Sequence, residues 1–169
     1  MRLFFALPCP DQVAARIVSW RDGLALDGSP VRAENLHVTL AFPGLQPADK
    51  LPALIRLAAS IEASAFLLQL DQLRCWADGL LHLAPGKRPG ALLNLASQLQ
   101  QKLDAEGFKL DQREYLPHLS LARNCTVPVS VAPPAFCWKV EEFALFHSQS
   151  RPGGVHYEAL ASWKLQLAE

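Results

Sequence analysis

Two short segments of the sequence repeat one pattern of residues that can transfer protons. Each has a histidine, one apolar residue, a hydroxyl residue and a leucine: His37-Val38-Thr39-Leu40 and His118-Leu119-Ser120-Leu121. Polar and apolar residues alternate in both segments, which is typical of a β-strand and places the histidine and the hydroxyl on one face. The apolar residues between them are then expected to face the core.

Two histidines that face each other across a cleft can supply both parts of acid–base catalysis. An unperturbed imidazole has a pKa of about 6.5, so at neutral pH one ring can accept a proton while the other donates one. The hydroxyls of Thr39 and Ser120 can donate to the non-bridging oxygens of a phosphate, where charge builds up in the transition state. These groups suit a phosphodiester substrate, and no nucleophilic side chain is needed.

Other uses of the histidines fit the sequence less well. A zinc site needs three or four protein ligands, and neither motif has a carboxylate, a cysteine or a further histidine beside it at ligand spacing. We therefore expect no metal and no other cofactor. A non-catalytic pocket for phosphorylated nucleotides or RNA ends stays open as an alternative, although arginine or lysine would serve binding alone equally well.

Length and composition set further limits. The 169 residues, half of them hydrophobic, are expected to form a single domain over 1–169, made of two lobes that share a core. Lys plus Arg and Asp plus Glu both number 16, so no global positive field is available to hold a long nucleic acid. The four cysteines are scattered, and no apolar stretch is long enough to span a membrane. We expect a cytoplasmic protein with reduced thiols.

The elements that must position the motifs can be read from periodicity and turn residues. The expected order is a strand over 2–7, a helix from 10 to about 24, the first motif strand, a helix over 48–62, a strand over 66–76, a strand over 80–83, a helix over 89–106, the second motif strand, and strands over 138–147 and 155–167. In the first motif strand, Val38, Leu40 and Phe42 are expected to face inward. Asp78-Gly79 predicts a hairpin turn.

The order contains a weak duplication. Each motif strand lies about a dozen residues after an amphipathic helix, which itself follows an apolar strand. The two histidines are 118 − 37 = 81 residues apart. Two related halves that pack about a pseudo-twofold axis would bring the motif strands together at a shared cleft.

The quoted motifs, with the opening Arg2-Leu3-Phe4-Phe5-Ala6 and the segment Arg113-x-Tyr115-x-Pro117-His118-Leu119-Ser120-Leu121-x-Arg123, resemble the 2H phosphoesterase superfamily. Within it, the chain is most similar to the bacterial RNA 2′,3′-cyclic phosphodiesterase family, also called 2′-5′ RNA ligases. The resemblance extends to Gly154-x-x-Tyr157 and Trp163-x-Leu165. It implies an α+β, bilobal fold in which two antiparallel β-sheets with flanking helices surround a central cleft.

The resemblance also implies an activity. Members open a terminal 2′,3′-cyclic phosphate to a 2′-phosphate without metal or ATP, and the reverse reaction joins RNA ends through a 2′-5′ linkage. By motif match, His118 is expected to be the base that activates water and His37 the acid, with Thr39 and Ser120 holding phosphate oxygens. The expected partners are RNA 3′ ends or nucleoside 2′,3′-cyclic phosphates, bound by a monomer. A phosphodiesterase of small cyclic nucleotide derivatives is a second alternative.

Four further residues are candidates for substrate binding. Arg123 matches a family arginine near the phosphate, yet strand parity places it on the face opposite His118, so either the strand bulges or Arg123 is structural. Arg113 could contact the RNA backbone. Phe5 and Tyr115 could offer a face for a terminal base to stack on.

Two other positions are expected to matter less. Ser120 stands where the family often has threonine, but the hydroxyl donor remains, so activity is expected to persist. His82 and His147 lie on other expected strands without a hydroxyl partner, and both are expected to be half-exposed structural residues.

Overall fold

The structure is a computed structural model that describes residues 1–126, 131–132 and 134–167. Its helices are α1 Asp11–Asp22, α2 Leu51–Ala59 and α3 Gly90–Ala105, with short 3₁₀ turns at Ala33–Asn35 and Ala48–Lys50. Its strands are β1 Arg2–Pro8, β2 Ser29–Pro30, β3 His37–Leu45, β4 Phe66–Leu70, β5 Gln72–Cys75, β6 Leu81–Ala84, β7 Leu119–Arg123, β8 Phe136–Val140, β9 Glu142–Arg151 and β10 Gly154–Lys164.

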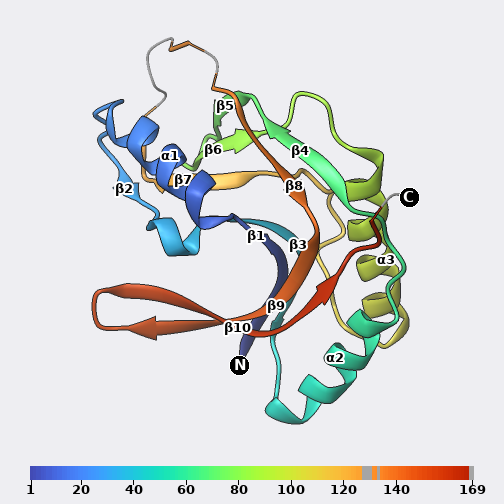
Figure 1. Ribbon diagram of the computed structural model, residues 1–169. Helices are drawn as coiled ribbons and strands as arrows, with labels where there is room; N and C mark the ends of the chain where they lie inside the picture. Colours follow the sequence, from blue (N-terminus) through green and yellow to red (C-terminus); the bar gives the residue numbers. More distant parts are fainter. Residues whose placement is uncertain (127–130, 133, 168–169) are drawn as a thin grey trace.

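The strands form two antiparallel sheets. The larger has eight strands in the order β10-β9-β1-β3-β7-β6-β5, with β2 paired to β7, and the smaller consists of β4 and β8. Figure 1 shows α2 and α3 together along one side of the molecule and α1 apart from them, near β2 and β7, while the β9–β10 hairpin projects beyond the body. The predicted α+β fold with two antiparallel sheets is confirmed.

The two halves of the chain meet where β3 pairs with β7. The segments β1–α1–β3 and β6–α3–β7 follow one another in the same order, and their strands are mirrored about the β3–β7 pair in the larger sheet. Each half also packs a helix on elements of the other, since α3 contacts β3 and α1 contacts β8. This arrangement agrees with the predicted duplication, whereas the division into two lobes of one domain stays a prediction.

The predicted core of the third helix is confirmed. Its buried residues recur at helical spacing and are Leu92, Leu95, Ala96, Leu99 and Leu103. The helix ends before Gly107, whose φ of +89° suits glycine, and the backbone N–H of Phe108 donates to the carbonyl of Leu103 at 3.0 Å. No helix in the described ranges is long and apolar enough to cross a membrane.

Two predicted long strands are each divided between the sheets. The predicted strand over 66–76 breaks at Asp71 into β4 and β5, and the strand over 138–147 breaks at Glu141 into β8 and β9. In both cases one piece joins the two-stranded sheet and the other joins the eight-stranded sheet. The prediction of continuous strands was wrong because alternation of polar and apolar residues continues through a corner where the strand changes sheet.

The predicted inward position of Phe42 is also wrong. The β1–β3 register shifts between the pair Phe5 and Ala41 and the pair Ala6 and Thr39, which leaves one extra residue in β3. Such a bulge reverses the parity of the residues beyond it, so Ala41 is buried and Phe42 is 43% exposed. The guanidinium of Arg2 lies over the Phe42 ring, 5.1 Å from its centre.

Candidate active site

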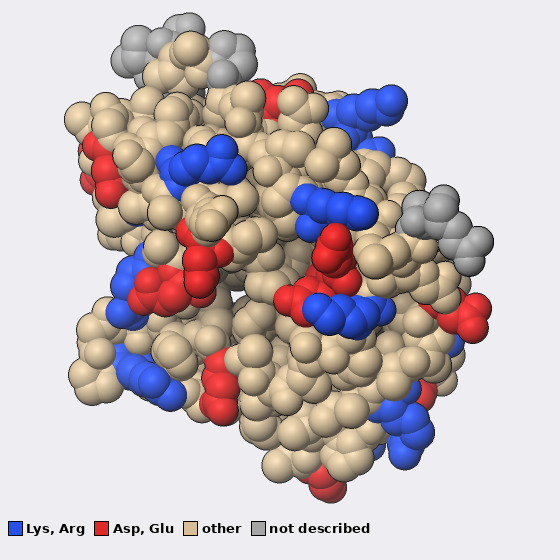
Figure 2. Space-filling model, in the orientation of Figure 1, with Lys and Arg blue, Asp and Glu red and all other residues tan. Residues whose placement is uncertain are grey.

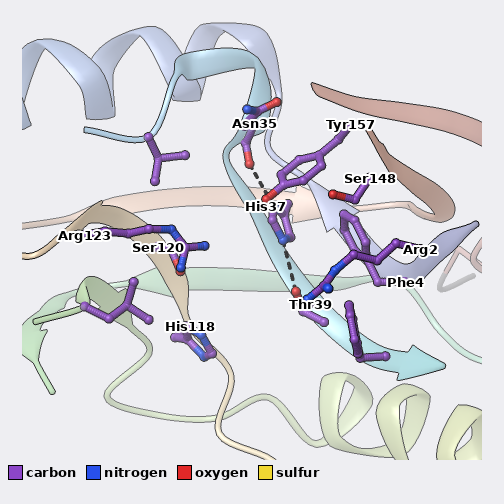
Figure 3. A pocket seen from close by; sticks show the side chains of 13 residues that line it. Arg2, Phe4, Asn35, His37, Thr39, His118, Ser120, Arg123, Ser148 and Tyr157 are labelled. Carbon is purple, nitrogen blue, oxygen red and sulfur yellow. Dashed lines mark hydrogen bonds between the residues drawn. The ribbon is translucent and has the colours of Figure 1, made fainter. Parts of the chain in front are cut away.

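A cavity of about 240 Å³ lies over the line where β3 and β7 meet (Figure 3). Both repeated motifs line it through His37, Thr39, His118 and Ser120, and Arg123 closes one side. Residues 81 positions apart in the sequence therefore share one pocket. The structure thus brings together the two histidines and two hydroxyls that the sequence singled out.

The β3–β7 register explains this juxtaposition. Val38, the residue between the first histidine and its hydroxyl, pairs with Leu119, its counterpart in the second motif. In an antiparallel pair, this register sets His37 across from Ser120 and Thr39 across from His118. Val38 and Leu119 are almost fully buried, so the polar groups project from the opposite face. The local twofold symmetry of the pair thereby generates a site with matched halves.

Both histidines are held by the same type of hydrogen bond. The Nδ1 of His37 lies 2.7 Å from the carbonyl of Asn35, and the Nδ1 of His118 lies 2.8 Å from the carbonyl of Leu116. Each carbonyl belongs to the residue two positions earlier. Because a carbonyl oxygen only accepts, Nδ1 carries the hydrogen in each ring, which leaves Nε2 as the atom that can gain or lose a proton.

The Nε2 of His37 has a hydrogen-bond partner in the site. It lies 3.0 Å from the Oγ1 of Thr39, the hydroxyl of the same motif (Figure 3). When the ring is neutral, the hydroxyl donates to Nε2; when the ring is protonated, Nε2 donates instead. Thr39 therefore fixes the orientation of the His37 ring at the atom that would move the proton.

Burial disfavours the charged forms of both histidines. Desolvation lowers the pKa of His37 and of His118, and the backbone carbonyl at each Nδ1 partly offsets this effect. The positive charges of His118 and Arg123 lower the pKa of His37 further. Both rings are therefore neutral at pH 7 without a ligand, and an anion bound between them would favour protonation.

Arg123 faces the cavity, which resolves the parity problem raised by the sequence. The β6–β7 register shifts between the pair Leu81 and Ala122 and the pair His82 and Ser120, which leaves one extra residue in β7. Leu121 and Ala122 are both buried as a result, and Arg123 returns to the face that carries Ser120. The bulged-strand interpretation of Arg123 is confirmed.

An aromatic wall borders His37, and sequence analysis missed it. The rings of Phe4 and Tyr157 lie with their centres 5.0 Å and 5.2 Å from the His37 ring. The strand period could have identified Phe4, which lies on the face of β1 opposite Phe5. The proposed stacking role of Phe5 is wrong, because Phe5 is fully buried and packs near Trp163.

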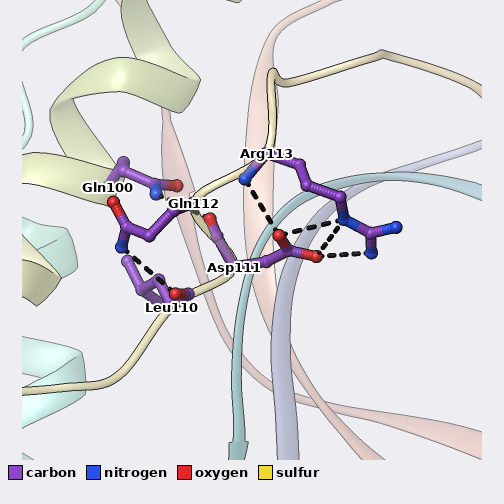
Figure 4. A network of polar contacts seen from close by, with 5 residues as sticks. All are labelled: Gln100, Leu110, Asp111, Gln112 and Arg113. Carbon is purple, nitrogen blue, oxygen red and sulfur yellow. Dashed lines mark hydrogen bonds and ion pairs between the residues drawn. The ribbon is translucent and has the colours of Figure 1, made fainter.

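Tyr115 and Arg113 do not line the cavity. The Tyr115 hydroxyl donates to the backbone carbonyl of Thr39 at 2.7 Å, so its ring supports β3 instead of offering a stacking face, and burial raises its pKa. Arg113 points into solvent with 88% of its side chain exposed and forms several hydrogen bonds to Asp111 (Figure 4). The structure thus gives neither residue the position expected of it.

His82 is not the half-exposed residue that the sequence suggested. It is 1% exposed, pairs across the sheet with Ser120, and has its ring centre 5.4 Å from that of His118. Its Nδ1 lies 3.1 Å from the Leu80 carbonyl, and burial lowers its pKa. A histidine on the neighbouring strand could have been placed here only with the β6–β7 register known. His147 is intermediate in exposure, which agrees with the half-exposed position predicted for it.

The site offers acid–base and hydrogen-bonding groups. Within the described residues, no three side chains of His, Cys, Asp or Glu come close enough to bind one metal ion together. The two motif histidines and the two motif hydroxyls line the cavity together with the side chains of Arg2 and Arg123. Such a set can bind a phosphate and transfer protons on either side of it.

Comparison with known proteins agrees with this geometry. A curated relative named RNA 2′,3′-cyclic phosphodiesterase, from Escherichia coli, is 36% identical and aligns over 97% of this chain and 96% of its own length. A relative of the same name from Thermus thermophilus is 29% identical over 98% of this chain and 91% of its own. The crystal structure of E. coli LigT complexed with 3′-AMP superposes with a TM-score of 0.91 at 35% identity, covering 97% of both chains.

A family model is matched as well. The model described as the 2′-5′ RNA ligase superfamily aligns with residues 9–151, a range that includes both motif strands and Arg123. Together with the relatives aligned over nearly their full lengths, this match shows that the chain belongs to the 2′-5′ RNA ligase superfamily of 2H phosphoesterases.

Proposed function

We propose that this protein is an RNA 2′,3′-cyclic phosphodiesterase that opens a terminal 2′,3′-cyclic phosphate to a 2′-phosphate. The observation that carries the proposal is the β3–β7 register, which sets two histidine–hydroxyl pairs around one cavity. The relatives named for this activity and the LigT complex with 3′-AMP support the same substrate class. The reverse reaction would join RNA ends through a 2′-5′ linkage.

In the proposed mechanism, the cyclic phosphate lies between the two Nε2 atoms. His118 takes a proton from water as the water oxygen bonds to phosphorus, and His37 gives its proton to the ribose 3′-oxygen as the P–O3′ bond breaks. Thr39 and Ser120 donate to the non-bridging oxygens, where Arg123 adds its positive charge. Each turnover moves one proton onto His118 and one off His37, so proton exchange with solvent restores the starting state.

The neutral rings of the free protein fit this scheme. The phosphodiester brings a negative charge between the histidines, which favours protonation of one ring at the moment the substrate binds. The hydrogen bonds from Nδ1 to the backbone carbonyls keep both Nε2 atoms directed at the substrate. Binding therefore prepares the acid while the other histidine stays neutral as the base.

The substrate is expected to be held by its end. Lys and Arg side chains are interspersed with Asp and Glu on the face shown in Figure 2 and do not gather into one positive track. With 16 acidic and 16 basic residues, long-range attraction to an RNA backbone is weak. The polar groups that line the cavity, with Arg123 and the two motif hydroxyls among them, then provide most of the phosphate binding.

The proposal is tested by product analysis. The protein is incubated in EDTA with an RNA oligonucleotide that ends in a 2′,3′-cyclic phosphate, beside the His37→Ala and His118→Ala variants. We expect a 2′-phosphate product that is lost in both variants. A 3′-phosphate product would contradict the proposed leaving group, and tight binding without turnover would identify a binding module for RNA ends.

The setting of the enzyme is part of the same proposal. We infer a cytoplasmic monomer; the cytoplasmic setting is supported by four cysteines that are all free thiols, of which only Cys137 is exposed. Burial raises the pKa of the Cys9 thiol to about 12, which keeps it protonated and unreactive. Mass measurement in solution under reducing and non-reducing conditions would show whether thiol oxidation or association occurs.

A further inference from the structure

A second, smaller cavity of about 100 Å³ lies on the other side of His118. Among the residues that the structure describes, His118 is the one that lines both this cavity and the larger one. The walls of the second cavity come from the β5–β6 hairpin, the segment after β6 and the segment before β7. Apart from His118, none of the residues that line this cavity has a part in the proposed hydrolysis of a single nucleotide.

Trp76 supplies an aromatic surface in the second cavity. Its ring lies 4.2 Å from the His82 ring and 4.7 Å from the His118 ring, centre to centre, yet 36% of the residue is exposed. The hairpin turn holds it in place, because the Trp76 backbone N–H donates to the Leu80 carbonyl at 3.1 Å and its carbonyl accepts from Gly79 at 2.9 Å. A fixed, partly exposed indole beside a catalytic group is a surface on which a nucleobase can stack.

Two arginines flank this aromatic surface. Arg74 and Arg88 both line the second cavity, and both are exposed. The acidic group paired with Arg88 is Glu114, at 3.2 Å, and 75% of the Glu114 side chain is exposed. Exposed pairs of this kind contribute little stability, so a phosphate can replace the carboxylate at low cost. The charge of the second cavity thus suits an anion.

We propose that the second cavity binds a further nucleotide of the RNA, one position away from the reacting phosphate, with its base on Trp76 and its phosphate near Arg74 and Arg88. This inference rests on the proposed function. His118 lines both cavities. An RNA that occupies the two cavities therefore passes His118, the residue at which the proposed chemistry takes place. The second cavity then adds affinity for RNA over a mononucleotide.

The bound nucleotide could come from two sources. It could precede the terminal nucleotide in the same strand, or it could carry the 5′-oxygen that attacks in ligation and leaves when a 2′-5′ linkage is cleaved. The test uses three substrates: a nucleoside 2′,3′-cyclic phosphate, a 3′-5′ dinucleotide that ends in a 2′,3′-cyclic phosphate, and a 2′-5′ linked dinucleotide whose downstream nucleotide carries a 3′-phosphate, so that each dinucleotide has one phosphate besides the reacting one. The kcat/KM of each dinucleotide relative to the mononucleotide is the readout.

For Trp76→Ala, we expect one of the two dinucleotide ratios to fall about five- to a hundredfold, the range found when a base loses its stacking partner. The ratio that falls identifies the source. Trp76→Phe should restore most of it, because a smaller ring still stacks. An equal loss on all three substrates would overturn the proposal, since Trp76 would then act only through His118, and so would no loss on any.

The arginines are tested by salt dependence. In the Arg74→Ala/Arg88→Ala variant, the slope of log kcat/KM against log salt for the affected dinucleotide should become shallower by about 0.7 for each phosphate that an arginine no longer neutralises. Arg113→Ala is the control, because Arg113 is also an exposed arginine but lies outside both cavities. An equal change in the control would reduce the effect to general charge and overturn the arginine assignment.

Failure of this inference can be separated from failure of the proposed function. Wild-type turnover of the nucleoside 2′,3′-cyclic phosphate tests the proposed function alone, because that substrate fills only the larger cavity. If this turnover is present and both dinucleotide ratios are unchanged in Trp76→Ala, the second cavity is not a nucleotide site.

Discussion

The two motif strands carry the same groups in different surroundings. In β3 and β7 alike, the histidine Nδ1 is bound to the carbonyl two residues earlier, and a hydroxyl follows two residues later. The His37 ring is enclosed by Phe4 and Tyr157, however, whereas His118 lies beside Trp76 at the mouth of an arginine-lined cavity. The two halves therefore share the groups that transfer protons and differ in the residues that surround each histidine.

This difference bears on how one site can run a reaction in two directions. Symmetric Nε2 atoms allow either histidine to gain or lose a proton, which reversible transfer of a phosphoryl group requires. The different surroundings of His37 and His118 then decide which substituent of the phosphate lies next to each histidine. Variants of matched residues in the two halves can test how far this equivalence extends, beginning with the histidines themselves.

The largest effects are expected from His37→Ala and His118→Ala. Each should lower kcat for an RNA 2′,3′-cyclic phosphate by roughly 10²- to 10⁴-fold, the usual contribution of a general acid or base. The same variants are compared on bis(p-nitrophenyl) phosphate, whose nitrophenolate group leaves without a proton. His37→Ala should keep most of its activity on this substrate if His37 is the acid, while His118→Ala should not.

Circular dichroism of both variants serves as the folding control for that comparison, because the rings are half-buried and their loss leaves the core intact. The reverse outcome, rescue of His118→Ala alone, would exchange the acid and the base. If neither variant keeps its activity on bis(p-nitrophenyl) phosphate, both histidines are needed for a step other than protonation of the leaving group, such as substrate binding.

How much of this site was readable from the sequence differs between residues. The histidines and hydroxyls were found because period-two alternation fixes the face of a strand near the motif itself. Arg123 and Phe42 lie beyond β-bulges, and a bulge leaves no sequence signal as simple as alternation. Alternation along a strand therefore predicts the face of a residue only within about one motif length, because a bulge beyond it reverses the faces.

The fold shows the same division. The order of strands and helices followed from local patterns, and the buried stripe of α3 was predicted residue by residue. The division of two long strands between sheets, and the burial of His82 against Ser120, depend on which strands become neighbours. Such pairings are settled by packing over the whole chain, so that no single segment could have revealed them.

The next largest effects are expected from the hydroxyls, and they should be unequal. Thr39→Val removes a donor to the phosphate and also the hydrogen bond at His37 Nε2, so kcat should fall by about 10²- to 10³-fold. Ser120→Ala removes a donor alone and should cost less. Ser120→Thr restores the donor as a matched control. Equal losses in Thr39→Val and Ser120→Ala would mean that the His37 hydrogen bond contributes nothing to catalysis.

The smallest effect is a shift in pH dependence in Arg123→Gln. The charge of Arg123 lowers the pKa of His37, so its removal should raise that pKa. If His37 is the acid, kcat/KM requires it protonated, and the alkaline limb of the profile moves to higher pH. If His37 is the base, the acid limb moves instead.

NMR titration of the His37 ring in the free protein assigns the shift to this residue, and an unchanged titration would place Arg123 too far from His37 to act on it. Because the two histidines share the cavity, a small shift of His118 in the same direction would measure how strongly the two halves are coupled.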